Sequence, residues 1–186
     1  MRRPPARHVH LAVLETPAST GHAPLRAELA ERDVLAFGAD GALRAAYPFA
    51  PVPTSIQVTW AGGPVAYAMC AIDALGMSAM LGRPVTIIAA EPGTGRIITV
   101  HADRDLARWI PRSAIVFAGA TGDRGCPSVD RTCGYINFFT SARAARTWAH
   151  ANPAVTGTVL RKAQALRRGI AEFGAFMQAG DGTGRS

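Results

Sequence analysis

The sequence predicts an α+β fold built around a largely antiparallel sheet with packed helices. Short segments of alternating polarity are separated by turn residues, as in strands joined by hairpins. The chain has 186 residues, of which 48% are hydrophobic, and can therefore bury one sizeable core. The run YAMCAIDALGMSAML, residues 67–81, is apolar nearly all round and predicts a buried helix within that core.

The first part of the chain predicts a short N-terminal unit, in which residues 1–7 form a disordered basic leader. Residues 23–33 have helical spacing, with Leu25 and Leu29 on one face. Residues 33–49 predict two short extended pieces around the turn GADG. A helix followed by a small hairpin is typical of a winged helix, here reduced in length. The predicted organisation comprises this unit, a core and a flexible tail, over residues 1–54, 55–179 and 180–186.

The core begins with an alternating strand over residues 55–60. Pro64 suits the first turn of a helix, where its missing N–H needs no partner. We therefore expect the buried helix to run from Pro64 to about Leu81 and to stop at Gly82. The segments PVTIIAA and RIITVHA, joined by EPGTG, predict a hairpin.

The second half of the core is expected to hold two further strands and two helices. The strands are residues 113–119 and the segment GYINFFTS, which begins just after Cys133. Ser141 predicts the N-cap of a helix that runs through about Ala151. The final helix is expected over residues 155–178.

The distribution of positive charge argues against a nucleic-acid-binding protein. The net charge is +7, and Lys162 is the only lysine. The clearest basic cluster, residues 161–168, falls on a predicted helix, whose solvated face explains it. The other basic residues are spread along the chain. A transcriptional regulator, suggested by the charge and the winged-helix-like start, is therefore the weakest interpretation, and nucleic acid is not an expected partner.

The cysteines and apolar runs predict a cytoplasmic protein with reduced thiols. Three cysteines are an odd number, which argues against a disulfide framework. The apolar run Leu11 to Leu14 is too short for a signal peptide. The run over residues 67–81 would place Asp73 near the centre of a membrane span, at a large cost in lipid, so no membrane partner is expected.

One constellation could carry chemistry. Cys70 and Asp73 are three residues apart on the predicted buried helix and so share a face. A buried carboxylate is costly unless it is paired or protonated, and burial raises its pKa. By itself Asp73 is equally well explained as a cap on a neighbouring element or as a structural pair with an arginine, and Cys70 is better explained by core packing. Cys133 adds a second thiol where a polar loop meets an apolar strand. Two thiolates and a carboxylate fit a soft metal of low coordination number better than zinc.

The motifs MCAIDAL with LGRP, TCGYINFF and ARTWAHAN, followed by a long C-terminal helix, resemble the organomercurial (alkylmercury) lyase family over about residues 55–178. The resemblance implies that Cys70, Asp73 and Cys133 are catalytic and bind the mercury of substrate and product. Cys133 would attack mercury, Cys70 would add next, and Asp73 would protonate the departing carbon. The resemblance implies an organomercurial substrate and no cofactor. It also implies that turnover needs external thiols and that Hg(II) passes to cellular thiols or to a mercuric reductase.

The chain departs from the family pattern in three places. Its N-terminal unit is shorter than the usual winged-helix-like domain, and Gly134 follows Cys133 where family members can carry a second cysteine. Cys126 is an additional thiol in the preceding loop. It is either an incidental cysteine or a mobile ligand that helps to load or unload mercury, and its nearness to Cys133 favours the second interpretation.

Two alternatives to the lyase stay open at this level. The first is a non-catalytic binding protein of the same fold for Hg(II) or Cu(I). The second is a paralogue of the family recruited to another reaction. The presence of all three reactive residues favours the lyase over both.

Overall fold

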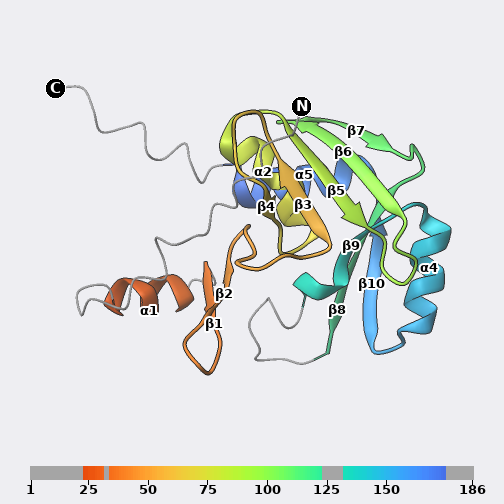
Figure 1. The fold of residues 1–186 in the computed structure, drawn as a ribbon. Coiled ribbons are helices and arrows are strands. Elements are labelled where there is room, and N and C mark those ends of the chain that lie inside the picture. Colours follow the sequence, from red (N-terminus) through yellow and green to blue (C-terminus); the bar gives the residue numbers. More distant parts are fainter. Residues whose placement is uncertain (1–22, 32–33, 123–131, 175–186) are drawn as a thin grey trace, which may run out of the picture.

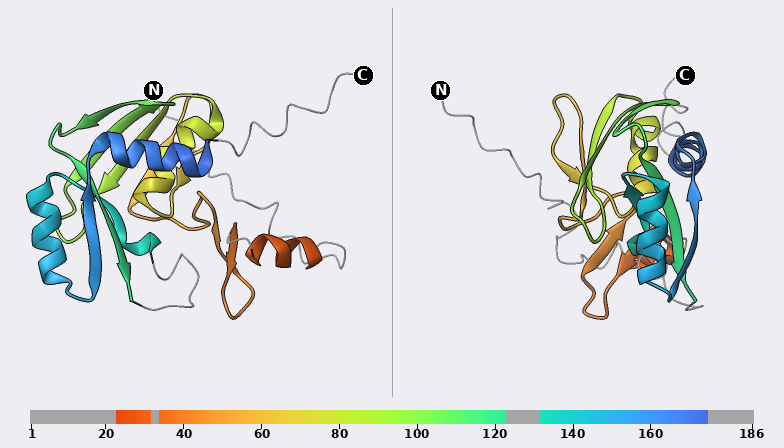
Figure 2. Two further views of the ribbon diagram at one scale, coloured as in Figure 1. Left: turned by 180° about the vertical axis from the view of Figure 1, so that it is seen from behind. Right: turned by 90° about the vertical axis from the view of Figure 1, so that its right-hand side faces the viewer.

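The computed structural model describes residues 23–31, 34–122 and 132–174. It confirms the predicted α+β class, since every pair of neighbouring strands runs antiparallel and helices pack on the sheets (Figure 1). Figure 2 shows the layers: helix α2 (Ala71–Leu81) lies between the larger sheet and helix α5 (Lys162–Phe173). None of the helices in the described ranges is long and apolar enough to cross a membrane.

Two sheets form the core. The five-stranded sheet has the order β4 (Ala66–Tyr67), β3 (Ile56–Thr59), β5 (Val85–Ala90), β6 (Ile97–Asp103) and β7 (Leu106–Ile110). The three-stranded sheet has the order β10 (Val155–Leu160), β8 (Ile115–Thr121) and β9 (Ile136–Phe139), with helix α4 (Ala142–Ala151) packed against it. The edge-to-face contact between Trp109 and Phe138, with ring centroids 5.6 Å apart, joins the two sheets in one core.

The alternating polarity of the central strands places their apolar residues under α2. Val85, Ile87 and Ala89 are buried, whereas Ile88 between them is 39% exposed. The register pairs Ile87 with Val100 of β6, which is also fully buried. Because successive side chains of a strand point to opposite faces, one face of the sheet forms the core and the other meets solvent.

The N-terminal unit is attached to the core just ahead of α2. Helix α1 (Ala23–Glu31) is followed by the hairpin of β1 (Leu35–Phe37) and β2 (Leu43–Ala46), as the sequence predicts. The leader 1–7 and the tail 180–186 lie outside the described residues, and the boundary at residue 54 stays a prediction.

The start of the buried helix is a correction to the sequence-based expectation. The helix begins at Ala71, with Cys70 as its N-cap, and not at Pro64. The preceding residues are extended instead: Ala66 and Tyr67 form β4, which pairs with β3. The predicted stop is confirmed, since Gly82 caps the helix in the left-handed region with φ of 63°.

One further expectation is wrong. Residues 155–160 form strand β10, and the last helix starts only at Lys162. The segment Leu106–Ile110, for which the sequence predicts no element, forms the edge strand β7. The hairpin of β5 and β6, strand β8, strand β9 and the helix capped by Ser141 are confirmed within two residues of their expected ends.

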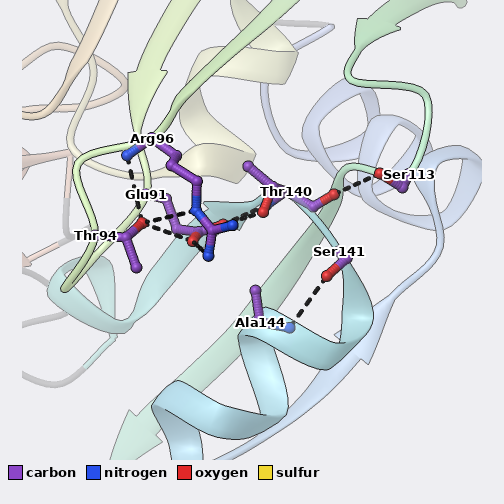
Figure 3. Close-up of polar contacts among 7 residues, drawn as sticks. All are labelled: Glu91, Thr94, Arg96, Ser113, Thr140, Ser141 and Ala144. Carbon is purple, nitrogen blue, oxygen red and sulfur yellow. Dashed lines mark hydrogen bonds and ion pairs between the residues drawn. The ribbon is translucent and has the colours of Figure 1, made fainter.

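Glu91 joins the hairpin of β5 and β6 to the end of β9 (Figure 3). Its side chain is 1% exposed, and Oε2 accepts hydrogen bonds from the N–H and hydroxyl of Thr140, both at 2.6 Å. Oε1 accepts from the Thr94 hydroxyl at 2.7 Å and lies 3.2 Å from the Arg96 guanidinium. Burial would raise the pKa of this carboxyl, but the hydrogen bonds from Thr140 and Thr94 outweigh it and lower the pKa.

Candidate active site

Cys70 occupies the N-cap of α2 rather than a position in the middle of a helix. Its backbone is extended, with φ of −152° and ψ of 176°, and its Sγ accepts a hydrogen bond from the N–H of Asp73 at 3.4 Å. The spacing of three residues is therefore a capping geometry, in which the side chain of the N-cap satisfies a free N–H of the first turn. It places the sulfur at the positive end of the helix dipole.

Cys70 is nevertheless 2% exposed. Burial raises the pKa of its thiol well above the usual range, and the neighbouring Cys133 and Asp73 raise it further. The hydrogen bond from the backbone of Asp73 opposes this shift only in part. Cys70 is therefore a protonated thiol at neutral pH.

Asp73 is the buried acid of the first turn, with 4% of its surface exposed. No residue that the structure describes donates a hydrogen bond to its Oδ2. Burial raises the pKa of this carboxyl to about 8, with further contributions from the charges of Cys133 and Glu172, while hydrogen bonding to Cys70 acts in the opposite direction. Asp73 therefore holds a proton at neutral pH and can donate it.

Cys133 comes from a distant part of the chain. It opens the one-turn 3-10 helix η1 (Cys133–Tyr135), which leads directly into β9, and it is 6% exposed. Strand β9 is held by pairing with β8 and by contacts with α2, so the sulfur is carried to the start of that helix. The thiol lies 3.5 Å from the hydroxyl of Tyr47.

The three side chains that the sequence singles out form one cluster. A ligand atom of each of Cys70, Asp73 and Cys133 lies within 4.8 Å of the other two. A metal ion held in a line between two thiolates needs its sulfurs roughly 4.6 Å apart, which is twice a typical metal–thiolate bond. The cluster is thus compact enough for one soft metal ion to contact both sulfurs, with a carboxyl group beside it.

The predicted fourth participant, Cys126, lies outside the described residues. Two residues that act on the cluster were not predicted from the sequence. Tyr47 contacts a cysteine from the N-terminal unit, and Glu172 acts on Asp73 from α5. Neither has a spacing or motif that connects it with the cysteines, because both reach the site only through tertiary packing.

Comparison with known proteins gives one consistent result. A family model for alkylmercury lyase matches residues 49–174. The crystal structure of the mercury-bound form of MerB2 superposes with a TM-score of 0.69 at 25% identity, covering 89% of this chain and 81% of that one.

Curated relatives agree with the family model. Alkylmercury lyase from Staphylococcus epidermidis is 30% identical over 103 residues, which are 55% of this chain and 46% of the relative. The Streptomyces lividans enzyme is 27% identical over 124 residues, 66% of this chain and 55% of the relative. The Bacillus cereus enzyme is 30% identical over 118 residues, 63% of this chain and 53% of the relative. The chain thus spans about half the length of the curated relatives it matches.

Proposed function

This chain belongs to the alkylmercury lyase family, and we propose that it cleaves the carbon–mercury bond of organomercurials to give a hydrocarbon and Hg(II). The observation that carries the proposal is the cluster of two thiols and one proton-bearing carboxyl within 4.8 Å. Mercury is a soft metal that prefers thiolate ligands, and the carboxyl supplies the proton that the departing carbon requires.

The reaction begins with thiol exchange. The substrate arrives as R–Hg–SR′, bound to a cellular thiol. The sulfur of Cys133 bonds to mercury, and the proton of Cys133 leaves with the displaced R′SH. The substrate is now R–Hg–S–Cys133, with its mercury beside Cys70 and Asp73.

Protonolysis follows. Cys70 adds to mercury as a second sulfur, which raises the electron density at the metal and weakens its bond to carbon. Asp73 delivers its proton to the carbon, R–H departs, and the proton released from Cys70 returns Asp73 to its neutral form. Mercury is left as Hg(II) between two thiolates, and the protons and charges balance.

Release of the product requires external thiols. Two molecules of R′SH take Hg(II) as Hg(SR′)₂ and return their protons to Cys70 and Cys133. The chemistry needs no resident cofactor, and the product suits transfer to cellular thiols or to a mercuric reductase. A reducing cytoplasm supplies both the thiols and the reduced cysteines, so we place the protein there.

Burial serves this mechanism in two ways. The exposed fractions of 2%, 4% and 6% for Cys70, Asp73 and Cys133 limit access of water to the cluster. The same apolar surroundings keep Asp73 protonated near neutral pH, because they disfavour its charged form.

The test is headspace analysis of benzene from phenylmercury in the presence of excess thiol. We expect release by the wild type, and its loss in Cys70→Ser, Cys133→Ser and Asp73→Ala. Ser113→Ala, which removes a hydroxyl that donates to the Thr140 carbonyl at 2.7 Å, is the matched control and should stay active. Intact phenylmercury after long incubation with the wild type would reject the proposal and favour a binding protein for Hg(II) or Cu(I).

Cys126 can be tested in the same assay. If it helps to load or unload mercury, Cys126→Ser slows turnover when external thiol is limiting and leaves a single turnover unchanged. Equal rates at every thiol concentration would make it an incidental cysteine.

A further inference from the structure

Tyr47 contacts the cluster from outside the part of the chain that the family model matches. Its hydroxyl lies 3.5 Å from the Sγ of Cys133, whereas the match begins at residue 49. The N-terminal unit therefore reaches one of the two sulfurs. A role for this contact in mercury chemistry rests on the proposed function.

The backbone holds Tyr47 beside the site. Its N–H donates to the carbonyl of Val34 at 3.0 Å, within the N-terminal unit. The next residue, Pro48, accepts a hydrogen bond from the N–H of Met69 at 3.2 Å. The N–H of Ala50 donates to the carbonyl of Tyr67 at 2.8 Å.

These bonds tie the turn after β2 to the segment that leads directly into Cys70 (Figure 1). Phe49 continues the attachment through a bridge to Ala68, which is fully buried. Tyr47 itself is half-buried, and its ring packs against the main core. The tyrosine is thus fixed relative to the first cysteine while its hydroxyl contacts the second.

A phenol hydroxyl suits both states of that second sulfur. A free thiol donates its hydrogen to the phenol oxygen, as in this structure. A sulfur bonded to mercury has no hydrogen and can accept the hydrogen bond of the phenol instead. The contact can therefore persist when mercury binds.

We propose that Tyr47 is a positioning residue, whose hydroxyl holds the Cys133 sulfur where it can share one mercury atom with Cys70. The short η1 turn sets the backbone of Cys133, and the hydroxyl of Tyr47 sets the direction of its side chain. The N-terminal unit is in this way part of the active site.

The decisive variant is Tyr47→Phe, which keeps the packed ring and removes only the hydroxyl. Loss of one hydrogen bond should lower kcat for phenylmercury by about tenfold. We expect little change in KM, because substrate capture by thiol exchange still occurs. The melting temperature should stay at the wild-type value, since ring and backbone contacts remain. Ser113→Ala is again the control for removal of a hydroxyl.

A second measurement separates this proposal from the proposed function. Protein loaded with Hg(II) is mixed with a dithiol chelator, and the rate of mercury transfer is recorded. A misaligned Cys133 should release Hg(II) several-fold faster in Tyr47→Phe than in the wild type. This difference is expected even if the wild type releases no hydrocarbon, an outcome that would reject the lyase and support the positioning role.

Two results would overturn the positioning role. One is a Tyr47→Phe variant with wild-type kcat and wild-type mercury transfer. The other is a fall in melting temperature with activity restored at lower temperature, since the hydroxyl would then stabilise the fold rather than the sulfur.

Discussion

Gly76 of α2 and Gly169 of α5 touch backbone to backbone. A methyl group added at Gly76 would lie 2.6 Å from the carbonyl oxygen of Gly169, and one added at Gly169 would lie 2.7 Å from the N–H nitrogen of Gly76. These separations are shorter than real side chains tolerate, and the obstructing atoms are backbone. The two helices can therefore cross this closely only with glycine at both positions, and the crossing places the start of α2 in the core.

Gly169→Ala should consequently destabilise the protein, although the same change in an open helix stabilises by about 1 kcal/mol. Overpacking against the carbonyl of Ile72 and the backbone of Gly76 should cost about 1–3 kcal/mol, measured as the free energy of unfolding in urea. Activity should fall as well, because Ile72 precedes Asp73 on the helix that would shift.

Gly122→Ala is the matched control for this prediction. No described atom lies within 4 Å of a methyl group added at Gly122, so its stability should stay near that of the wild type. A Gly169→Ala protein that is more stable than the wild type would show that the helices can separate without cost.

Local signals in the sequence were sufficient for the elements that have clear ends. Gly82 stops α2 because its φ of 63° suits glycine, and Ser141 starts α4 because its hydroxyl accepts from the N–H of Ala144. The missed strand β10 shows the opposite situation. Its β-branched residues flank Gly157 on both sides, but the strand depends on close pairing with Gly119 of β8, which no local pattern reveals.

The residues of the site likewise fall into a group that the sequence predicts and a group that depends on tertiary packing. Spacing and family resemblance singled out Cys70, Asp73 and Cys133, and the structure brings them together. Their surroundings could not be predicted, because Tyr47 arrives through the docking of a turn and Glu172 through the crossing of two helices. Even the expected shared helix face of Cys70 and Asp73 is a capping contact at the end of the helix.

Glu91 offers a test of what holds the two sheets together. Glu91→Gln keeps the shape of the side chain but removes its charge, so the two bonds from Thr140 weaken. We expect a loss of about 1–3 kcal/mol in the free energy of unfolding, as for hydrogen bonds to charged groups. Arg96→Ala is the control: its side chain is 61% exposed, and such ion pairs contribute about 0–1 kcal/mol.

The same variant should also change the response to acid. The pKa of Glu91 is lowered on folding, so its contribution to stability is present above the unfolded pKa and is lost as pH falls through the folded one. The free energy of unfolding of Glu91→Gln should therefore fall less steeply than that of the wild type below about pH 4.3.

The control for the stability of Glu91→Gln is Arg96→Ala. Equal losses in the free energy of unfolding of the two variants would mean that the stabilisation comes from the ion pair and not from the hydrogen bonds of Thr140.

Asp73 makes the opposite prediction, because its pKa is raised on folding to about 8. Below the unfolded value of about 3.9 both states hold the proton. Above it only the unfolded state releases the proton, so stability falls with rising pH, by up to about 1.4 kcal/mol per unit, until the folded value is passed. Asp73→Asn does not titrate and should exceed the wild type in stability by a few kcal/mol at about pH 8.

Urea unfolding of wild type and Asp73→Asn at about pH 5 and about pH 8 measures this difference. The advantage of the variant should grow between the two conditions, and Asp105→Asn, at an exposed aspartate, should show no such growth. Parallel curves for Asp73→Asn and the wild type would mean that Asp73 is ionised in the folded protein, and would contradict its proposed role as proton donor.

Substitution of Glu172 can change the pKa of Asp73 without altering any of the three clustered side chains. It is an exposed residue of α5 whose charge adds to the effects of burial and of Cys133 in raising the pKa of Asp73. Glu172→Gln should lower that pKa, because the ionised form of Asp73 then has one fewer negative neighbour. In the proposed mechanism, the single-turnover rate of phenylmercury cleavage falls where Asp73 loses its proton. This descending limb should therefore move to lower pH while the maximal rate stays the same. The shift should shrink at high ionic strength, since salt screens the charge of an exposed residue.

Asp103→Asn is the control, because it removes an exposed acid from β6 and should leave the descending limb in place. An unchanged limb in Glu172→Gln would show that Glu172 has no influence on the proton of Asp73.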